Sequence, residues 1–177
     1  MKKYVPTYSA NTIFEIDLNF FLKNKFKYLF VDLDNTLDGP HTYVPSLKTI
    51  DLFKKFKKVG LNVVVCSNNS KKRVSKYCQS LNCEYIYRAF KPFPYAIRKY
   101  MNNKKIDGNF AIIIGDQIAT DIFCANKLKI KSILTNRLTN KDQIVTYLNR
   151  KIDEHLRKKV KESKLTKSWR EVYVENK

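Results

Sequence analysis

Four short groups of polar residues have types and spacings that could form one catalytic site. Asp32, Ser67, Lys91 and Asp116 mark the four groups, and 35, 24 and 25 residues separate them in turn. The groups are Asp32-Leu33-Asp34-Asn35-Thr36, Ser67-Asn68-Asn69, Lys91-Pro92 and Gly115-Asp116-Gln117, the last followed by Asp121. Carboxylates held close together repel one another and suit a hard divalent cation such as Mg²⁺. A hydroxyl, amides and a lysine add donors for an anion, so the set is typical of phosphoryl transfer.

Each group, taken singly, also has a structural interpretation. Asp34, Asn35 and Thr36 could form a turn, and Ser67 could cap a helix. Lys91 could be one more surface lysine, and Asp121 could be a first-turn helix charge. The coincidence of four groups, each after an apolar run, favours a common site.

Two other classes of site are disfavoured. A Gly-rich phosphate loop is missing from the sequence, which argues against a nucleotide-hydrolysing P-loop protein. The four cysteines and two histidines lack the paired spacing of a zinc site. We expect Cys66 and Cys124 to be small buried side chains.

Short apolar runs alternate with segments of helical periodicity along the chain. The expected strands are Tyr28–Leu33, Leu61–Cys66, Glu84–Tyr87, Phe110–Ile114 and Lys131–Leu134. The expected helices are 45–58, 70–81, 94–101 and 119–128. This alternation predicts an α/β fold, a parallel sheet with helices on both faces. The carboxyl ends of such strands meet at one edge of the sheet, and all four polar groups follow strand ends.

The four-part order resembles the signature of the haloacid dehalogenase (HAD) superfamily of phosphotransferases. The stretches that carry the resemblance are DLDNTL (32–37), SNNSKKRV (67–74), KP (91–92) and GDQIATDI (115–122). Their details resemble the YqeG-like branch of subfamily IIIA, which includes phosphatidylglycerophosphate phosphatases. The similarity runs from about Tyr4 to about Ile152, and it implies a Rossmann-like HAD fold.

The resemblance implies a role for each residue. Asp32 would be the nucleophile that forms an aspartyl-phosphate, and Asp34 would be the general acid and base. Mg²⁺ would be held by Asp32, the backbone carbonyl of Asp34 and Asp116, with Asp121 in support. The phosphoryl group would contact Ser67, with Asn68 nearby, and Lys91 would neutralise its charge. Thr36 and Asn35 belong to the expected substrate-binding loop.

Two further features adjoin these residues. The segment Asp38-Gly39-Pro40-His41 replaces the apolar residue that relatives have after DLDNTL, which predicts a more polar flap over the site. Arg73, on the helix after Ser67, could touch substrate or solvent, and we expect it to be solvated.

The spacing of the four groups leaves no room for an inserted cap domain. We expect one HAD domain in residues 1–150, with residues 1–26 packed on it as an extension. Residues 151–177 would form a basic helical tail. Ile144, Leu148, Ile152, Leu156 and Val160 recur every four residues in this region. The tail would pack on the sheet or on another subunit, or it would lie on an anionic membrane surface.

The formal net charge of +19 is unevenly distributed, with +10 in residues 51–100. Together with an uncapped site, this charge favours a phosphate monoester displayed on an anionic surface. The expected function is Mg²⁺-dependent hydrolysis of phosphatidylglycerophosphate to phosphatidylglycerol. The alternatives are a phosphatase for soluble sugar phosphates, nucleotides or phosphoproteins, and an RNA- or ribosome-associated protein on a HAD scaffold.

The sequence also suggests where the protein works. No apolar run approaches the length of a transmembrane helix, and the start MKKYVPTYSANT lacks the apolar segment of a signal peptide. We therefore expect a cytoplasmic protein with reduced thiols, peripheral to the inner face of the membrane if the lipid substrate is correct.

Overall fold

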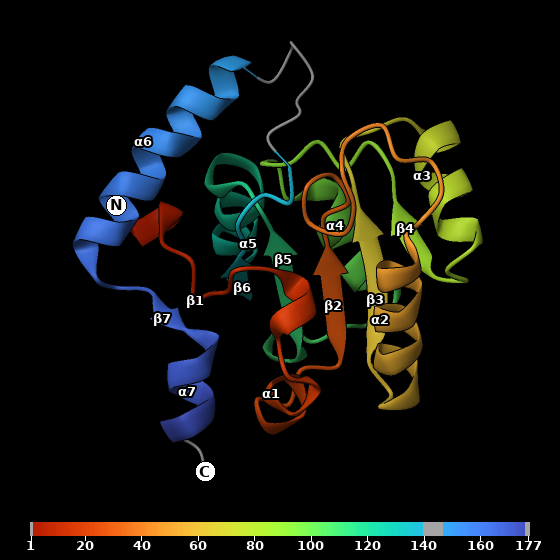
Figure 1. The fold of residues 1–177 in the computed structure, drawn as a ribbon, viewed down its shortest axis with the longest axis horizontal. Coiled ribbons are helices and arrows are strands. Elements are labelled where there is room, and N and C mark those ends of the chain that lie inside the picture. The colour runs from red at the N-terminus through yellow and green to blue at the C-terminus, as the bar shows by residue number, and fades with distance from the viewer. Residues whose placement is uncertain (1, 140–146, 176–177) are drawn as a thin grey trace.

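The computed structural model describes residues 2–139 and 147–175, and a parallel sheet lies at its centre (Figure 1). Within these residues the sheet has seven strands in the order β4-β3-β2-β5-β6-β1-β7. The strands are β1 (Tyr8–Ser9), β2 (Tyr28–Val31), β3 (Asn62–Cys66), β4 (Glu84–Ile86), β5 (Ala111–Gly115), β6 (Lys131–Leu134) and β7 (Lys167–Ser168). Every strand pair is parallel, which confirms the predicted α/β fold.

Helices connect these strands. The α-helices are α1 (Leu18–Lys23), α2 (Leu47–Lys58), α3 (Lys71–Gln79), α4 (Tyr95–Asn103), α5 (Phe123–Leu128), α6 (Tyr147–Ser163) and α7 (Trp169–Glu175). Short 3₁₀ turns lie at η1 (Lys2–Tyr4), η2 (Ile13–Glu15) and η3 (Gly108–Phe110), and η4 (Ile118–Ile122) is a π-helix. The predicted helix over residues 119–128 is therefore two elements, η4 followed by α5. No helix in the described part of the chain combines the length and apolar character needed to cross a bilayer.

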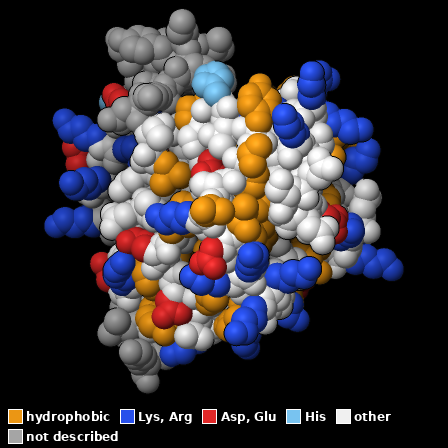
Figure 2. Space-filling model, turned by 45° about the vertical axis from the view of Figure 1, so that its right-hand side comes forward, with side chains coloured by type: hydrophobic (Ala, Val, Ile, Leu, Met, Phe, Trp, Pro, Cys, Tyr) orange, Lys and Arg blue, Asp and Glu red, His pale blue; other side chains and the backbone are white. Residues whose placement is uncertain are grey.

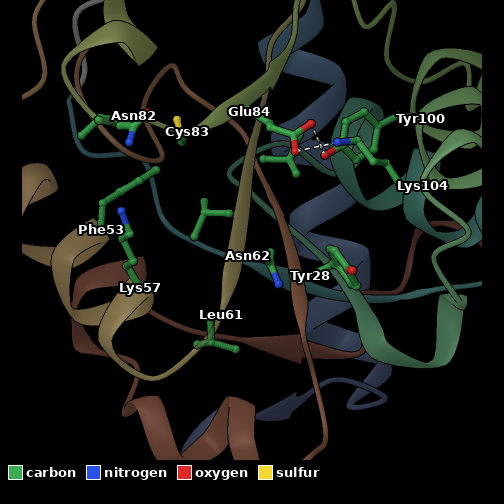
Figure 3. A pocket seen from close by; sticks show the side chains of 13 residues that line it. Tyr28, Phe53, Lys57, Leu61, Asn62, Asn82, Cys83, Glu84, Tyr100 and Lys104 are labelled. Atoms are coloured by element: carbon green, nitrogen blue, oxygen red, sulfur yellow. Dashed lines mark hydrogen bonds and ion pairs between the residues drawn. The ribbon is translucent and has the colours of Figure 1, made fainter.

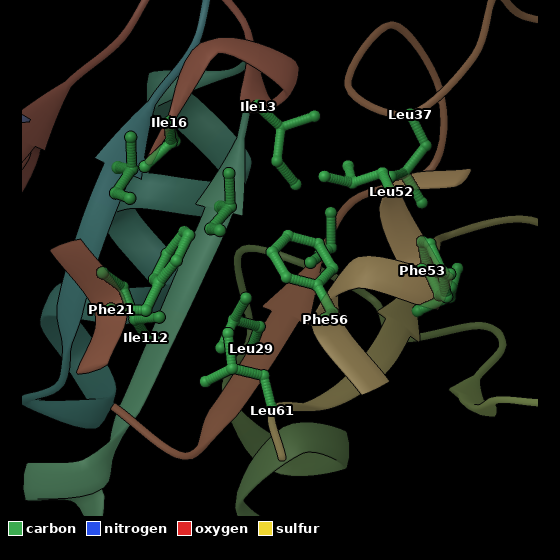
Figure 4. Packing of buried hydrophobic residues seen from close by; sticks show 14 of the residues in the cluster. Ile13, Ile16, Phe21, Leu29, Leu37, Leu52, Phe53, Phe56, Leu61 and Ile112 are labelled. Atoms are coloured by element: carbon green, nitrogen blue, oxygen red, sulfur yellow. The ribbon is translucent and has the colours of Figure 1, made fainter. Parts of the chain in front are cut away.

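The strands are buried on both faces, and alternate residues point into different cores. Leu29 and Val31 of β2 face a core that α1, α2 and α3 complete, part of which Figure 4 shows. Phe30 points to the opposite face and packs with residues of α4 and α5. Because a parallel strand with helices on both sides has no solvated face, the strands read as continuous apolar runs.

The N-terminal segment packs on the sheet, as expected from its apolar residues. Ile13, Phe20 and Phe21 are fully buried in the core on the α2 side. Asp17 begins α1 by accepting a hydrogen bond from the Asn19 amide at 2.8 Å. The segment also supplies β1, a two-residue strand too short for any periodicity to reveal.

Residues 147–175 join the same fold. Val160 of α6 is buried against Ile118 and Leu134, and Trp169 of α7 packs edge to face on Phe20 with ring centroids 6.1 Å apart. β7 extends the sheet beside β1. Ile152, one of the apolar residues expected to repeat along this helix, is half exposed. Ile144 lies outside the described residues, and so does the side chain of Leu148.

The register of the sheet fixes which residues meet at its carboxyl edge, the upper edge in Figure 1. Val31 at the end of β2 pairs with Val65 of β3 and Ile114 of β5. The amide of Asp32 continues this pairing by donating to the Ile114 carbonyl at 2.9 Å. In the described residues, only a flap and α2 connect β2 to β3, and only α3 connects β3 to β4, so no cap domain is inserted there.

Candidate active site

The ammonium of Lys91 joins two of the predicted carboxylates at the centre of the carboxyl edge. Its Nζ lies 2.6 Å from Oδ1 of Asp32, 2.6 Å from Oδ1 of Asp121 and 2.8 Å from the Cys66 carbonyl oxygen. Lys91 is almost completely buried, as are Cys66 and Asp121. The three acceptors satisfy all three N–H groups of the ammonium, so its position and orientation are fixed.

Burial and charge act against each other in this cluster. Burial by itself would lower the pKa of Lys91, but the charges of Asp121 and Asp32 raise it above its usual value. Burial raises the pKa of Asp32 to about 7, an effect that Lys91 opposes and that Asp121 and Asp34 reinforce. The site therefore holds more negative charge than its single lysine compensates.

Asp116 is the carboxylate that this lysine does not reach. Both of its carboxylate oxygens are buried, and neither has a hydrogen-bond partner among the described residues. The Arg137 Nε lies 3.7 Å from Oδ2, which is an ion pair beyond hydrogen-bond length. Burial raises the pKa of Asp116 well above its usual value, and the charges of Asp32 and Asp121 raise it further.

A divalent cation fits the oxygens of Asp32, Asp116 and Asp121. One oxygen from each residue lies within 4.8 Å of the other two. A buried carboxylate without a donor is costly, and a cation would supply the missing partner. Asp121 is the least available of the three, because its Oδ1 accepts from Lys91 and its Oδ2 accepts from the Gln117 amide at 3.2 Å.

The backbone after β5 lets Asp121 approach this closely. In the π-helix η4 the Gln117 carbonyl accepts from the Ile122 amide at 3.3 Å, five residues on, and from the Asp121 amide at 2.9 Å. A Cβ at Gly115 would lie 2.3 Å from the Asp121 Cγ, far inside a normal contact, so only glycine leaves room for that carboxylate. Single π-turns of this kind are frequent at functional sites.

Asp34 is held by an arginine that the sequence analysis expected to be solvated. That expectation for Arg73 is wrong, because Arg73 is buried and grips Asp34 with two hydrogen bonds of 2.8 and 2.5 Å. Asn69 donates a third hydrogen bond to Asp34 at 2.6 Å. The sequence contained a signal for this: Arg73 lies on the same helical face as Val74 and Tyr77, which are buried.

Ser67 and Asn68 differ in what they can offer to a ligand. Ser67 is buried at the end of β3, and its Oγ accepts from the Asn69 amide at 3.1 Å. Asn68 forms a pair of hydrogen bonds with the Lys91 backbone, at 2.8 Å to its amide and 3.0 Å to its carbonyl. Asn68 thus fixes the position of Lys91, and its substrate contact stays a prediction.

The loop after Asp34 folds inward. Asn35 has a φ of 64°, and its side-chain oxygen accepts from the Thr139 hydroxyl at 2.9 Å. Thr36 is buried, and its hydroxyl has no partner among the described residues. These contacts give Asn35 a part in fixing the loop, and substrate binding by Asn35 and Thr36 stays a prediction.

Asp38 is the residue expected to make the flap polar. Its Oδ2 accepts from the Tyr77 hydroxyl at 2.6 Å, the Thr49 hydroxyl at 3.0 Å and the Ser46 amide at 3.1 Å. One carboxylate oxygen therefore ties the flap to the start of α2 and to the buried face of α3. Burial and the Asp38 charge raise the pKa of Tyr77, which keeps its hydroxyl a donor.

Helix α6 supplies two site-supporting residues that the sequence analysis missed. Asp153 is buried and accepts from the amides of Ile118, at 2.6 Å, and Ala119, at 3.3 Å, at the start of η4. Arg157 pairs with Asp153 at 2.9 Å and donates to the backbone carbonyl of Asp116. The only sequence signal was the four-residue spacing of Asp153 and Arg157, which is common on exposed helices.

A pocket lies away from the carboxylates of Asp32, Asp116 and Asp121. It has a volume of about 360 Å³ and is lined at the amino ends of β2 and β3 by residues such as Tyr28 and Asn62 (Figure 3). At its rim Glu84 accepts from the Tyr100 hydroxyl at 2.8 Å and from the Lys104 ammonium at 2.9 Å. Glu84 is thus already paired, and the pocket shares no residue with the acidic cluster.

Comparisons with known proteins agree with the geometry. A family model described as HAD-hydrolase-like matches residues 89–156. The chain is 30% identical over 158 residues to the probable phosphatase YqeG of Bacillus subtilis (strain 168), covering 88% of this chain and 90% of that protein.

Two solved structures share the fold. An uncharacterized protein from Listeria monocytogenes serotype 4b is similar with a TM-score of 0.53 and 14% identity, covering 75% of this chain and 99% of that chain. The 3-deoxy-D-manno-octulosonate 8-phosphate phosphatase from Yersinia pestis is similar with a TM-score of 0.51 and 10% identity, covering 72% of this chain and 83% of that chain.

Proposed function

This chain belongs to the HAD phosphatase family that includes YqeG, and from that premise we propose how its residues divide the work and which phosphate they act on. Asp32 is the nucleophile, Asp34 is the general acid and base, and Lys91 holds Asp32 in place. The observation that carries this proposal is the Lys91 ammonium, 2.6 Å from both Asp32 and Asp121, beside Asp116, whose carboxylate accepts no hydrogen bond from the described residues.

The first chemical step transfers the phosphoryl group to Asp32. A carboxylate oxygen of Asp32 forms a bond to phosphorus, and the bond from phosphorus to the leaving oxygen breaks with its electron pair going to that oxygen. Asp34, protonated at this stage, gives its proton to the leaving oxygen, so the alcohol departs neutral. Arg73 donates to both oxygens of Asp34, which fixes the position of this carboxyl group beside the leaving oxygen.

The second step returns the enzyme to its starting state. Asp34, now ionised, removes a proton from a water molecule whose oxygen attacks phosphorus. The bond between phosphorus and Asp32 breaks, its electron pair restores the carboxylate, and inorganic phosphate leaves. Ser67 donates a hydrogen bond to a phosphoryl oxygen during both steps, and Lys91, whose three N–H groups stay with Asp32, Asp121 and Cys66, neutralises phosphoryl charge from where it lies.

We assign Mg²⁺ as the metal of this site. Asp32, Asp116 and the backbone carbonyl of Asp34 would hold it, with Asp121 in support. The all-oxygen donor set and the two free oxygens of Asp116 are consistent with this hard cation. When bound, Mg²⁺ supplies Lewis-acid neutralisation of the phosphoryl oxygens.

We propose phosphatidylglycerophosphate as the substrate. The site is open, because no cap is inserted in the described connections from β2 to β4, and an open site suits a phosphate presented at a surface. The excess of basic residues in 51–100 favours an anionic surface of this kind. The product would be phosphatidylglycerol and inorganic phosphate.

The test uses the purified full chain with Mg²⁺ and a panel of monoesters at equal concentration. The panel contains phosphatidylglycerophosphate in detergent micelles, sugar phosphates, nucleotides and a phosphopeptide. We expect the lipid to be preferred and Asp32→Asn to lose at least about a thousandfold in kcat. The matched control is Asp51→Asn, which removes an exposed carboxylate paired with Lys55 and should retain full activity.

Two results would contradict the proposal separately. Retained hydrolysis by Asp32→Asn would exclude Asp32 as the nucleophile. Preference for a soluble phosphate by orders of magnitude would exclude the lipid substrate while leaving the phosphatase chemistry intact.

A further inference from the structure

Large apolar side chains are exposed around the entrance to the carboxylate site. Tyr43 and Val44 in the flap are 49% and 59% exposed, and Tyr87, Phe90 and Phe93 in the loop after β4 are 40%, 65% and 62% exposed. We call these five residues the aromatic rim. Most exposed apolar side chains in a protein stand singly, so a group on two neighbouring loops indicates an interaction site.

The aromatic rim adjoins the catalytic lysine directly. Phe90 precedes Lys91, whose side chain points inward to Asp32. The Phe93 amide donates to the Phe90 carbonyl at 2.9 Å, so a hydrogen-bonded turn carries both rings. The same short loop therefore directs the Lys91 side chain into the protein and leaves the phenyl rings of Phe90 and Phe93 exposed to solvent. Nothing in the mechanism proposed above requires these rings.

Lysines lie beside several rings of the aromatic rim. The stretches 39–46, 68–76 and 87–95, which form this end of the molecule, contain no Asp or Glu. Lys76 lies 5.8 Å from the centre of the Tyr43 ring, Lys71 lies 5.9 Å from that of Tyr87, and Lys127 lies 5.3 Å from that of Phe93. On the face in Figure 2, hydrophobic side chains reach the upper edge of the molecule with Lys and Arg side chains beside them.

We propose that the aromatic rim docks on an anionic lipid bilayer, with the phenyl rings of Phe90 and Phe93 entering the interfacial region and the lysines contacting anionic headgroups. Aromatic and apolar side chains surrounded by lysines are the combination that binds such surfaces. Docking in this orientation points the entrance of the site at the headgroups. The proposal rests on the proposed function only for the identity of the lipid that is cleaved.

A lipid surface explains the aromatic rim better than a nucleic acid does. The side chains of Phe90, Phe93 and Val44 have no hydrogen-bonding groups, and they lie on two loops instead of a stacking platform on strands. The entrance also leads to a cluster of carboxylates, which repels a polyanion that lacks a terminal phosphate to place there.

The first experiment measures binding of the full chain to vesicles by co-sedimentation. We expect binding to vesicles of phosphatidylcholine with about 30% phosphatidylglycerol, and much weaker binding to phosphatidylcholine alone. The double variant Phe90→Ser/Phe93→Ser should lower the partition coefficient by about tenfold or more. Its matched control is Leu22→Ser/Leu165→Ser, which removes two exposed leucines away from the aromatic rim and should bind as the parent does.

The second experiment reports on the aromatic rim itself. In Phe93→Trp, a conservative change at an exposed site, the new indole is the solvent-exposed one, because Trp169 is buried. Adding anionic vesicles should shift its emission to shorter wavelength, whereas the parent emission should not move. Hydrolysis of p-nitrophenyl phosphate without vesicles should be unchanged in every one of these variants, which shows that the site is intact.

The outcomes separate the docking surface from the substrate. No binding to anionic vesicles, equal loss in both double variants, or an unshifted indole emission from vesicle-bound Phe93→Trp protein would overturn the proposal. Salt-sensitive binding to single-stranded RNA without binding to vesicles would also overturn it. Docking through the aromatic rim without cleavage of phosphatidylglycerophosphate would refute only the proposed substrate. Cleavage in micelles with no vesicle binding would refute only the docking surface.

Discussion

Replacing Gly115 with alanine should damage the site through one added methyl group. The new Cβ would lie 2.3 Å from the Asp121 Cγ, 2.5 Å from its Oδ2 and 2.6 Å from its Cβ. Carbon atoms in normal contact are about 3.5 Å apart or more, so the Asp121 carboxylate must retreat by about 1.2 Å. A retreat of that size is enough to take its 2.6 Å contact with Lys91 beyond hydrogen-bond length.

The cost follows from what the movement disturbs. Overpacking a buried position typically costs about 1–3 kcal/mol, and separating the partners of a buried ion pair costs about 3–5 kcal/mol. Because only part of the Lys91 pairing is lost, we expect Gly115→Ala to lower the free energy of unfolding by about 2–4 kcal/mol. We also expect a higher Mg²⁺ concentration for half-maximal activity and a kcat at least about tenfold lower, since a misplacement of about 1 Å can cost a hundredfold.

The assays are urea denaturation and Mg²⁺ titration of p-nitrophenyl phosphate hydrolysis. The control is Gly39→Ala in the flap, where an added Cβ would meet Thr139 at an ordinary 3.5 Å. That variant should keep both stability and activity to within about 1 kcal/mol and about twofold. If Gly115→Ala matched Gly39→Ala in both assays, the close approach of Asp121 to Gly115 would have no part in the site.

Two further changes probe the charges of the site. Arg73→Lys removes the pair of hydrogen bonds that Arg73 donates to Asp34. The kcat should fall about tenfold or more for alkyl phosphates and less for p-nitrophenyl phosphate, because the leaving group of the latter needs no proton. An equal loss for both substrates would refute a positioning role for Arg73. In metal-free protein the pKa of Asp32 is about 7 in the folded state, whereas its usual value is 3.8. Because the folded state binds this proton more tightly, protonation of Asp32 adds to the free energy of unfolding fully below about pH 4, and this contribution is lost as the pH rises through 7. Urea midpoints measured in EDTA at about pH 5 and about pH 8 should show this fall in the parent and a smaller fall in Asp32→Asn, and equal falls would contradict it.

The sequence predicted the sheet well because its strands are buried on both faces. Runs such as Ala111–Gly115 are fully buried, so they read as continuous apolar segments bounded by turns. The short strands β1 and β7 have two residues each and leave no pattern. They form because β1 pairs with β6 and β7 pairs with β1, and these contacts between distant parts of the chain leave no local pattern.

The sequence also predicted which polar groups gather at the carboxyl edge, because each follows a strand of the sheet. It could not predict which of them are free for a ligand. Asn68 and Asn35 were expected at the substrate, and their side-chain amides are also bonded to the Lys91 backbone and to Thr139, so their contact with substrate stays a prediction. Such pairings depend on where loops far apart in the chain pass each other, and Arg73 was misjudged for the same reason.

The bond from Arg157 to the Asp116 carbonyl has a consequence for the making of this protein. A ribosome adds residues from the amino end, so all four polar groups are synthesised before α6 exists. The loop that carries Asp116 can bond to Asp153 and Arg157 only after α6 has been synthesised. In the same way, β1 can pair with β7 only after residues 167 and 168 have been synthesised. Contacts so distant in sequence form only after both partners exist, so the loop that carries Asp116 reaches its final bonding only once residues 153 and 157 have been synthesised.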